Sequence, residues 1–475
     1  MEEGWSKRWA AGARLPDSRY RDDLAASWQG LADHPGSSWS AALGDRRRQS
    51  MGSLYHRQQY TVDDELAGVY RCAAEDWPPG EPGLMIVDTM FGDYRNHQAT
   101  VGLGKIGTGG EGWGLCCQAA LGASLDGQPR QVLDLICWTR GAGSQLPWPP
   151  EEKESTKWLK AMAAVQARLP GRPLTFVMDA ESDAFEVLAA PRAPGNEVLL
   201  LVAQDRRVEL DADEPPGWPA ARLLKAAVVG VPVAGQVTLH LPARAAKDGR
   251  PAQKEREAVL QIRYRTVWIQ PPDDWPKGTR PVKVSVVLAR EEGELGEGAE
   301  RVEWWLMSTA LILSFEDAVL DTRRYSYRWR IEQVHRLLKE TLRIERLQLD
   351  SAAKLSLAIG MQWPLAARAL WLRYEAADHG DRPAAEVFEA DEVVILSASA
   401  AHPVETVDDA VRAVGKLGGW VGGRKKDLPG AKVIVQGLFV LNERRIGYHL
   451  PREPCQLAMQ TEVHTQVEVR GERAG

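Results

Sequence analysis

Residues 84–88 read LMIVD, and residues 174–179 read LTFVMD. Each is a short apolar run that ends in an aspartate, and such a run predicts a strand buried on both faces. Further strands and helices are predicted around them, in the order strand 115–121, strand 132–138, helix 151–169, helix 184–190 and strand 198–202. The full order of three strands, helix, strand, helix and strand predicts an α/β fold with a mixed sheet.

Asp88 and Asp179 stand where the first and fourth predicted strands end. The ends of strands are where open α/β sheets build their binding and catalytic sites. An aspartate after an apolar run is nevertheless common in α/β proteins, so neither residue alone identifies a site. A third acidic residue on another element is needed to make the pair informative.

A polar stripe is predicted on a long amphipathic helix over residues 323–348. Its members recur at offsets 0, 3, 7, 11 and 14, and they are Tyr325, Arg328, Glu332, Arg336 and Lys339. At about 100° per residue these positions share one helix face, and the apolar residues fall on the other. An ordinary surface helix with ion pairs between neighbouring turns gives the same pattern.

Asp88, Asp179 and Glu332 together suit a hard divalent cation, because Mg²⁺ and Mn²⁺ prefer oxygen ligands. The cations and the phenol beside Glu332 suit the phosphate groups of a phosphodiester substrate. Zinc is not expected, since the sequence has no His/Cys cluster with ligand spacing.

Composition is that of an ordinary folded protein, with 475 residues, 44% hydrophobic and 26% charged. The net charge of −6 counts against DNA binding unless basic residues gather on one face.

Five cysteines without a CxxC pair indicate reduced thiols in a cytoplasmic protein. No signal peptide and no apolar run of about 18 residues is found, so no membrane association is expected.

The pattern changes along the chain predict three domains. Residues 1–80 are expected to be helical, and residues 81–375 to form the α/β core. Within that core, residues of about 205–300 alternate like strands and are rich in Pro and Val, which predicts a β-rich insertion. Residues 376–475 are expected to form a helical C-terminal domain with a disordered tail.

The spacing of Tyr325, Arg328, Glu332 and Lys339 resembles the Y-x2-R-x3-E-x6-K signature of DDE-type insertion-sequence transposases. That cut-and-paste family includes the transposase of the bacterial kanamycin-resistance composite transposon. Other segments resemble the family as well, namely 327–335 around the glutamate, 87–107 and 177–183 around the aspartates, 417–430, and more weakly 15–19.

The resemblance implies an RNase H-like catalytic core in which Asp88, Asp179 and Glu332 hold two Mg²⁺ or Mn²⁺ ions. It implies a homodimer on double-stranded DNA that nicks transposon ends, forms and opens a hairpin, and joins the ends to target DNA. Residues 1–80 would bind the transposon ends, residues 376–475 would dimerise, and the protein would lie in the bacterial cytoplasm with the nucleoid. The implied DNA contacts are Tyr325, Arg328, Arg330, His335, Arg336, Lys339 and one tryptophan, Trp304 or Trp305, that stacks on a flipped base.

Two other functions stay open on the sequence alone. A metal-dependent nuclease without strand transfer would use the same three carboxylates. A domesticated DNA-binding protein without catalysis would have no need of them.

Overall fold

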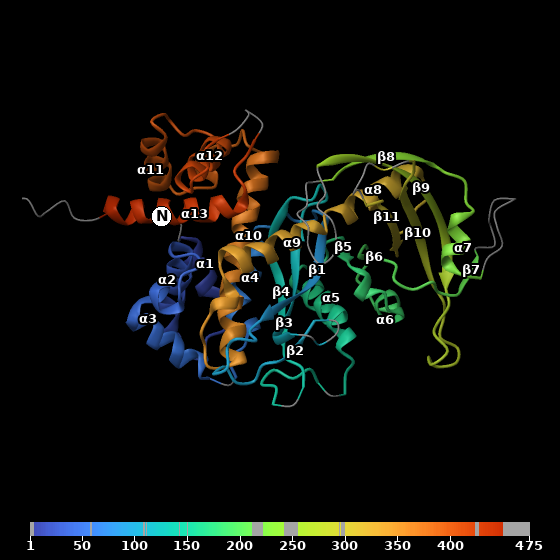
Figure 1. The fold of residues 1–475 in the computed structure, drawn as a ribbon, viewed down its shortest axis with the longest axis horizontal. Helices are drawn as coiled ribbons and strands as arrows, with labels where there is room; N and C mark the ends of the chain where they lie inside the picture. Colours follow the sequence, from blue (N-terminus) through green and yellow to red (C-terminus); the bar gives the residue numbers. More distant parts are fainter. Residues whose placement is uncertain are drawn as a thin grey trace, which may run out of the picture.

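The computed structural model describes residues 4–449, apart from residues 58, 108–109, 111, 142, 150, 211–221, 242–254, 294, 296–299 and 423–426. Eleven strands of the described residues form one mixed sheet, with helices packed on both of its faces (Figure 1). The predicted α/β class with a mixed sheet is therefore confirmed.

The first half of the sheet contains the five strands expected from the apolar runs. They are β1 (Gly83–Asp93), β3 (Gly112–Ala123), β4 (Pro129–Trp138), β5 (Leu174–Met178) and β6 (Glu197–Leu201). Strand β3 pairs antiparallel with both β1 and β4, whereas β5 runs parallel to β1 and β6 runs parallel to β5. A short strand, β2 (Gly104–Ile106), pairs with the start of β3.

The predicted β-rich insertion is rich in strands, but it does not form a separate unit. Its strands are β7 (Val208–Leu210), β8 (Gly235–Leu241), β9 (Arg256–Ile269) and β10 (Val282–Glu291). The next strand, β11 (Glu303–Ser308), pairs antiparallel with both β10 and β6. The insertion therefore continues the central sheet, and β6 does not stand at a free edge.

Two layers of helices cover the sheet, and each has its own apolar core. Alternate residues of β1 divide between them: Leu84 and Ile86 pack in one core, and Met85 and Val87 in the other. The first core lies under the N-terminal helices and α10 (Ala352–Asp378). The second lies under α5 (Lys157–Arg168), α6 (Phe185–Ala189) and α7 (Leu224–Val229).

Helices fill the described parts of both terminal regions. The N-terminal ones are α1 (Trp5–Gly12), α2 (Tyr20–Asp33), α3 (Trp39–Tyr55) and α4 (Val62–Glu75). The C-terminal ones are α11 (Ala390–Ala400), α12 (Val407–Leu417) and α13 (Ala431–His449), which share a third apolar core with the end of α10. The predicted disordered tail lies outside the described residues.

The prediction of one continuous helix over 323–348 is wrong, because the segment is divided into two helices and a π-helical turn. Helix α8 (Phe315–Ser326) ends before a two-residue turn, and α9 (Trp329–Arg336) continues into a π-helical turn at Leu337–Thr341. Helix α8 begins with a capping box in which Ser314 and Asp317 satisfy each other's backbone N–H groups. The interruption separates Tyr325 from the rest of the predicted stripe.

Cys72, Cys116, Cys117 and Cys137 are free thiols, as the sequence predicted for them. Within the described part of the chain, no helix combines the length and the apolar character needed to span a bilayer.

Candidate active site

Asp88 and Asp179 lie side by side at the sheet. Strands β1 and β5 are parallel, and Val87 pairs with Met178 at the last matched position. The next residue in each segment is the aspartate, so the two carboxylates lie at the same level. Asp179 directly follows β5, as predicted, but the prediction that the first strand ends at Asp88 is wrong, because β1 stays paired with β3 as far as Asp93. By alternation, Asp88 shares a face with Ile86, and Asp179 shares a face with Val177, in the core that helix α9 covers.

Glu332 reaches this pair from helix α9, whose first turn follows Arg328. Ile331 and Val334 are fully buried beneath the helix, as the apolar stripe predicted. That packing turns Arg328 and Glu332 toward the strands. Arg328 donates from Nη1 to Oδ2 of Asp88 at 3.2 Å, and from Nη2 to Oε1 of Glu332. One guanidinium therefore joins acidic residues from two elements that are remote in the sequence.

Asp88 is the most buried of the three acids, with 8% of its surface exposed. Its Oδ1 accepts a hydrogen bond from the backbone N–H of Thr89 at 2.8 Å. Burial raises the pKa of Asp88 to about 7, and the negative charges of Asp179 and Glu332 act in the same direction, while Arg328 opposes them. The site therefore concentrates negative charge where little water can solvate it.

Asp179 is partly buried, and its Oδ1 accepts from the backbone N–H of Glu181 at 2.9 Å. Burial, followed by the charge of Glu181, raises the pKa of Asp179, whereas Arg328 and Lys157 lower it. Lys157 is 4% exposed, and its Nζ lies 3.1 Å from Oε2 of Glu181. This second cation near the aspartates was missed from the sequence. Its signal was a charged residue on the apolar face of a helix, in line with Ala161 and Val165.

As the side chains stand, no group of three or more His, Cys, Asp or Glu residues among those described is arranged to bind one metal ion. Arg328 itself lies between Asp88 and Glu332. The donor chemistry still fits a hard cation, because all three acids offer carboxylate oxygens. Added positive charge would stabilise the ionised form of Asp88, whose pKa is raised first by burial and then by the charges of Asp179 and Glu332.

Tyr325 does not lie on the exposed stripe that the sequence predicted. It is 5% exposed, and its ring packs edge-on against Trp304 with 5.5 Å between the centroids. Burial raises the pKa of the phenol to about 12, although Arg328 lowers it. In this conformation Tyr325 supports Arg328 and Trp304 and is not free to grip a phosphate in solvent.

Trp304 and Trp305 point to opposite faces of β11. Trp304 packs against the core that includes Tyr325, on the face covered by α8 and α9. Trp305 packs against the other core, and its Nε1 donates to Oε1 of Glu303 at 2.9 Å. Of the two candidates for base stacking, only Trp304 shares a face with the carboxylates.

Arg330 was predicted to contact DNA, but its guanidinium makes contacts within the protein. Its guanidinium lies 3.9 Å from the ring centroid of Tyr374, donates to the phenol oxygen there, and donates from Nε to the carbonyl of Gly127 at 3.0 Å. Burial lowers the pKa of Arg330. The reason is helical geometry: position 330 is about 200° around the helix from both Arg328 and Glu332. Arg330 ties α9 to α10 and to the turn between β3 and β4.

His335 was also predicted to contact DNA, and its surroundings argue against that role. Its ring packs edge-on against Trp363 of α10 at 5.4 Å, and Nε2 is buried without a hydrogen-bond partner among the described residues. Burial, together with Lys339 and Arg328, lowers the pKa of His335 to about 3. The ring is therefore neutral near pH 7 and brings no positive charge to a phosphate.

Arg336 and Lys339 keep the outward positions that the stripe predicted. Arg336 is exposed, with its guanidinium 5.5 Å from the ring centroid of Trp329. Lys339 Nζ lies 3.3 Å from Oε1 of Glu345, which also accepts from the backbone N–H of Asp93 at the end of β1. Exposed arginines without an ion pair to any described residue gather along this segment, namely Arg323, Arg336, Arg343 and Arg346. They offset the net negative charge locally.

Comparison with known proteins leaves the family of this chain open. No family model matches it. Among solved structures, it is similar to the cryo-EM structure of the piggyBac transposase synaptic complex with hairpin DNA. The TM-score is 0.35 at 8% sequence identity, over 97% of this chain and 76% of that chain. A likeness at this level carries no argument about the site.

Proposed function

We propose that this protein is a DNA transposase that cleaves and joins phosphodiester bonds with a divalent metal ion. The observation that carries the proposal is that one guanidinium, that of Arg328, bonds both Asp88 and Glu332, while Asp179 follows the strand next to Asp88 and feels the charge of the same arginine. Three carboxylates held close together in a partly buried site repel one another, and this repulsion destabilises the fold unless a positive charge offsets it. Binding of Mg²⁺ or Mn²⁺ would supply that positive charge. The resemblance of residues 325–339 to a transposase signature supports DNA as the substrate.

Asp88, Asp179 and Glu332 would hold the metal, two ions in the full site. When bound, the ions would supply activation of a water or 3′-hydroxyl and stabilisation of the leaving oxygen. For the metal to be held, Arg328 must release Asp88 and Glu332. A phosphate of the DNA backbone can then accept the same guanidinium bidentately. We therefore assign Arg328 two positions, one on the carboxylates without DNA and one on a phosphate with DNA.

Residues around the carboxylates would bind phosphates, stack on a base and position Asp179. Arg336 and Lys339 lie outward on the same segment and would neutralise phosphates near the scissile bond. Trp304 would stack on a base turned out of the duplex, with Tyr325 packed behind it. Lys157 would keep Glu181, and through it Asp179, in place by its ion pair.

The finer features also belong to the proposal. They are an RNase H-like interpretation of β1, β3, β4, β5 and β6, hairpin formation and opening, end binding by residues 1–80, and a homodimer on DNA through residues 376–475. The RNase H-like interpretation is supported by the strand directions: β1, β3 and β4 are antiparallel neighbours, and β5 and β6 then run parallel to β1.

A nuclease without strand transfer is the alternative, since its site would contain the same acids. The experiment uses a labelled duplex that carries the DNA flanking the gene, both uncut and cut in advance to expose a 3′-hydroxyl. With Mg²⁺, the protein is expected to nick the uncut duplex and to join the cut end to a plasmid. Asp179→Asn should lose both activities, whereas Glu340→Gln, an exposed neighbour of the site, should keep them. Nicking without joining would favour the nuclease, and neither activity with any divalent metal would reject both.

A further inference from the structure

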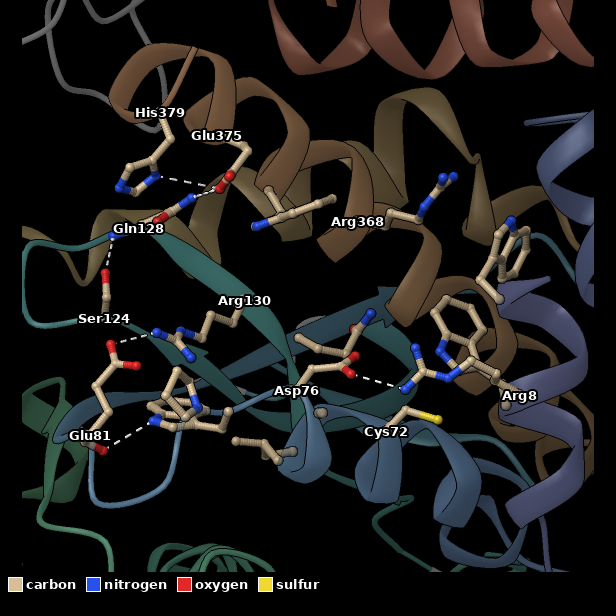
Figure 2. Close-up of a pocket in the computed structure, with 18 of the residues that line it drawn as sticks. Arg8, Cys72, Asp76, Glu81, Ser124, Gln128, Arg130, Arg368, Glu375 and His379 are labelled. Carbon is tan, nitrogen blue, oxygen red and sulfur yellow. Dashed lines mark hydrogen bonds and ion pairs between the residues drawn. The ribbon is translucent and has the colours of Figure 1, made fainter. Parts of the chain in front are cut away.

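A pocket with both polar and apolar walls lies away from the three carboxylates. It has a volume of about 770 Å³ and is bounded by α1, the end of α4, α10 and the turn between β3 and β4 (Figure 2). Trp77 and Glu81 line it just before the start of β1, whereas Asp88 and Asp179 lie farther along their strands. The pocket is therefore separate from the proposed catalytic site.

Helix α10 presents one polar stripe to this pocket. Arg368, Trp371, Glu375 and His379 line it at spacings of three and four residues, which is one face of a helix. Most of the remaining surface of α10 is buried among apolar residues. Glu375 of this row already pairs with Arg382, so Arg368 and the neighbouring ring of Trp371 are the members of the row that could receive a ligand.

The arginines of the pocket differ in how they are neutralised. Arg8 pairs with Asp76 at 2.9 Å, and Arg130 with Glu81 at 2.6 Å. Arg382 pairs with Glu375. The fourth cation, Arg368, has no hydrogen bond or ion pair with any described residue. Figure 2 shows the difference, because dashed lines join Arg8 and Arg130 to acids and none reaches Arg368.

Arg368 is partly buried, and its guanidinium lies 5.4 Å from the ring centroid of Trp5. Burial lowers its pKa, whereas the negative charges of Glu392 and Glu389 raise it. A guanidinium removed from water without a counter-charge in contact destabilises the folded chain. An anionic ligand would provide the missing contact.

We propose that this pocket binds a nucleoside phosphate, with the phosphate on Arg368 and the base against the ring of Trp5 or Trp371. A guanidinium is suited to phosphate oxygens, and a tryptophan face is suited to any base. Both rings are partly exposed, so each has surface to offer. The volume is in the range of pockets for small organic ligands. Asp76, Glu81, Gln128 and Gln131 bring polar atoms for the edges of the base and the sugar.

The first experiment measures binding of deoxyadenosine monophosphate to the full chain by calorimetry. We expect saturable binding at one site per chain, and binding of deoxyadenosine about tenfold weaker or worse, because the contact with Arg368 is charge-assisted. A single-stranded oligonucleotide of four deoxyadenosines distinguishes the source of the ligand. Tighter binding of the oligonucleotide assigns the pocket to a DNA strand, and equal or weaker binding assigns it to a free nucleotide.

The matched variants are Arg368→Gln and Arg373→Gln, two arginines of the same helix of which only the first lines the pocket. Arg368→Gln should weaken binding of the monophosphate about tenfold or more, and Arg373→Gln should leave it unchanged. The monophosphate should also raise the unfolding temperature of the parent chain and not that of Arg368→Gln. Trp5→Leu and Trp371→Leu, which keep the cation, distinguish the two rings, because only the ring that stacks on the base should weaken binding of both the nucleotide and the nucleoside when it is removed.

Two results would overturn the proposal. One is the absence of saturable binding by either the monophosphate or the oligonucleotide. The other is equal affinity of the parent chain and Arg368→Gln, or of the monophosphate and the nucleoside. Because these readouts need no metal and no cleavage, they fail or succeed independently of the proposed transposase activity.

Discussion

Asp88 and Arg328, which are 240 residues apart in the chain, form an ion pair with 3.2 Å between Oδ2 and Nη1. The same guanidinium donates to Glu332 on the next turn of its helix. Arg328 therefore does in the free protein what a metal ion is proposed to do in the active complex. It holds the acids of the site together by positive charge.

Replacing Arg328 by alanine should destabilise the fold by about 2–3 kcal/mol near pH 7, because it leaves the buried Asp88 without its counter-charge. The loss should be smaller with Mg²⁺, since the ion can take over neutralisation. Urea unfolding with Mg²⁺ and with EDTA measures both effects, and Arg336→Ala is the exposed control. An Arg328→Ala chain as stable as the parent in EDTA would contradict this account of the ion pair.

Trp304 and Trp305 should respond differently to substitution by alanine. Trp304→Ala should reduce cleavage and the fluorescence change of a 2-aminopurine placed at the cut site, because Trp304 lies on the face of the carboxylates. Trp305→Ala should lower stability through the second core and leave the fluorescence change intact. The reverse result would assign the stacking role to Trp305.

Arg330 and Arg336 should separate packing from DNA binding. Arg330→Ala should cost about 2 kcal/mol of stability, because it removes the contacts with Tyr374 and Gly127. Arg336→Ala should leave stability unchanged and reduce the slope of log affinity against log salt by about one. Urea unfolding and DNA binding at several salt concentrations give the two readouts. A reduced slope for Arg330→Ala would restore it as a phosphate contact.

The central strands and the aspartates that follow two of them could be predicted from the sequence, for a physical reason. A strand buried on both faces must be continuously apolar, so 84–87 and 174–178 could be recognised together with the aspartate that follows each run. The end of the first strand could not be located in this way, because β1 continues past Asp88 to Asp93, whereas Asp179 does follow the end of β5. The apolar stripe of Ile331 and Val334 likewise placed Glu332 on the polar face of its helix, but it did not show that this face turns toward β1.

The interruption between α8 and α9 could not be predicted from that periodicity. Tyr327 and Arg328 keep helical backbone angles, and neither is a glycine or a proline, so no residue type marks the turn. The burial of Tyr325 and His335 depends on Trp304 and Trp363, which come from other elements. The continuation of the sheet into β9 and β10 depends on long-range pairing that a local pattern does not specify.

Stability should depend on pH through Asp33 at the end of α2. Burial raises the pKa of Asp33 to about 6, although Gln29 donates to it at 2.8 Å and lowers the pKa. A carboxyl with a folded pKa above its unfolded value of about 3.9 adds stability below that pH, and this stability is lost as pH rises to about 6. Asp33→Asn should therefore gain stability relative to the parent, by up to about 3 kcal/mol, between pH 4 and 7. Urea unfolding at several pH values measures the difference, and a constant difference would contradict the shift.

Cleavage by Glu332→Gln tests the central claim most directly. The change removes one negative charge from the site and keeps the size of the side chain, so DNA binding should persist. With Mg²⁺ and a labelled duplex from the flanking DNA, Glu332→Gln should cleave at least about a hundredfold more slowly than the parent chain. Glu340→Gln, in the π-helical turn after α9, should cleave at the rate of the parent. Equal cleavage by Glu332→Gln and the parent would contradict a site built from Asp88, Asp179 and Glu332.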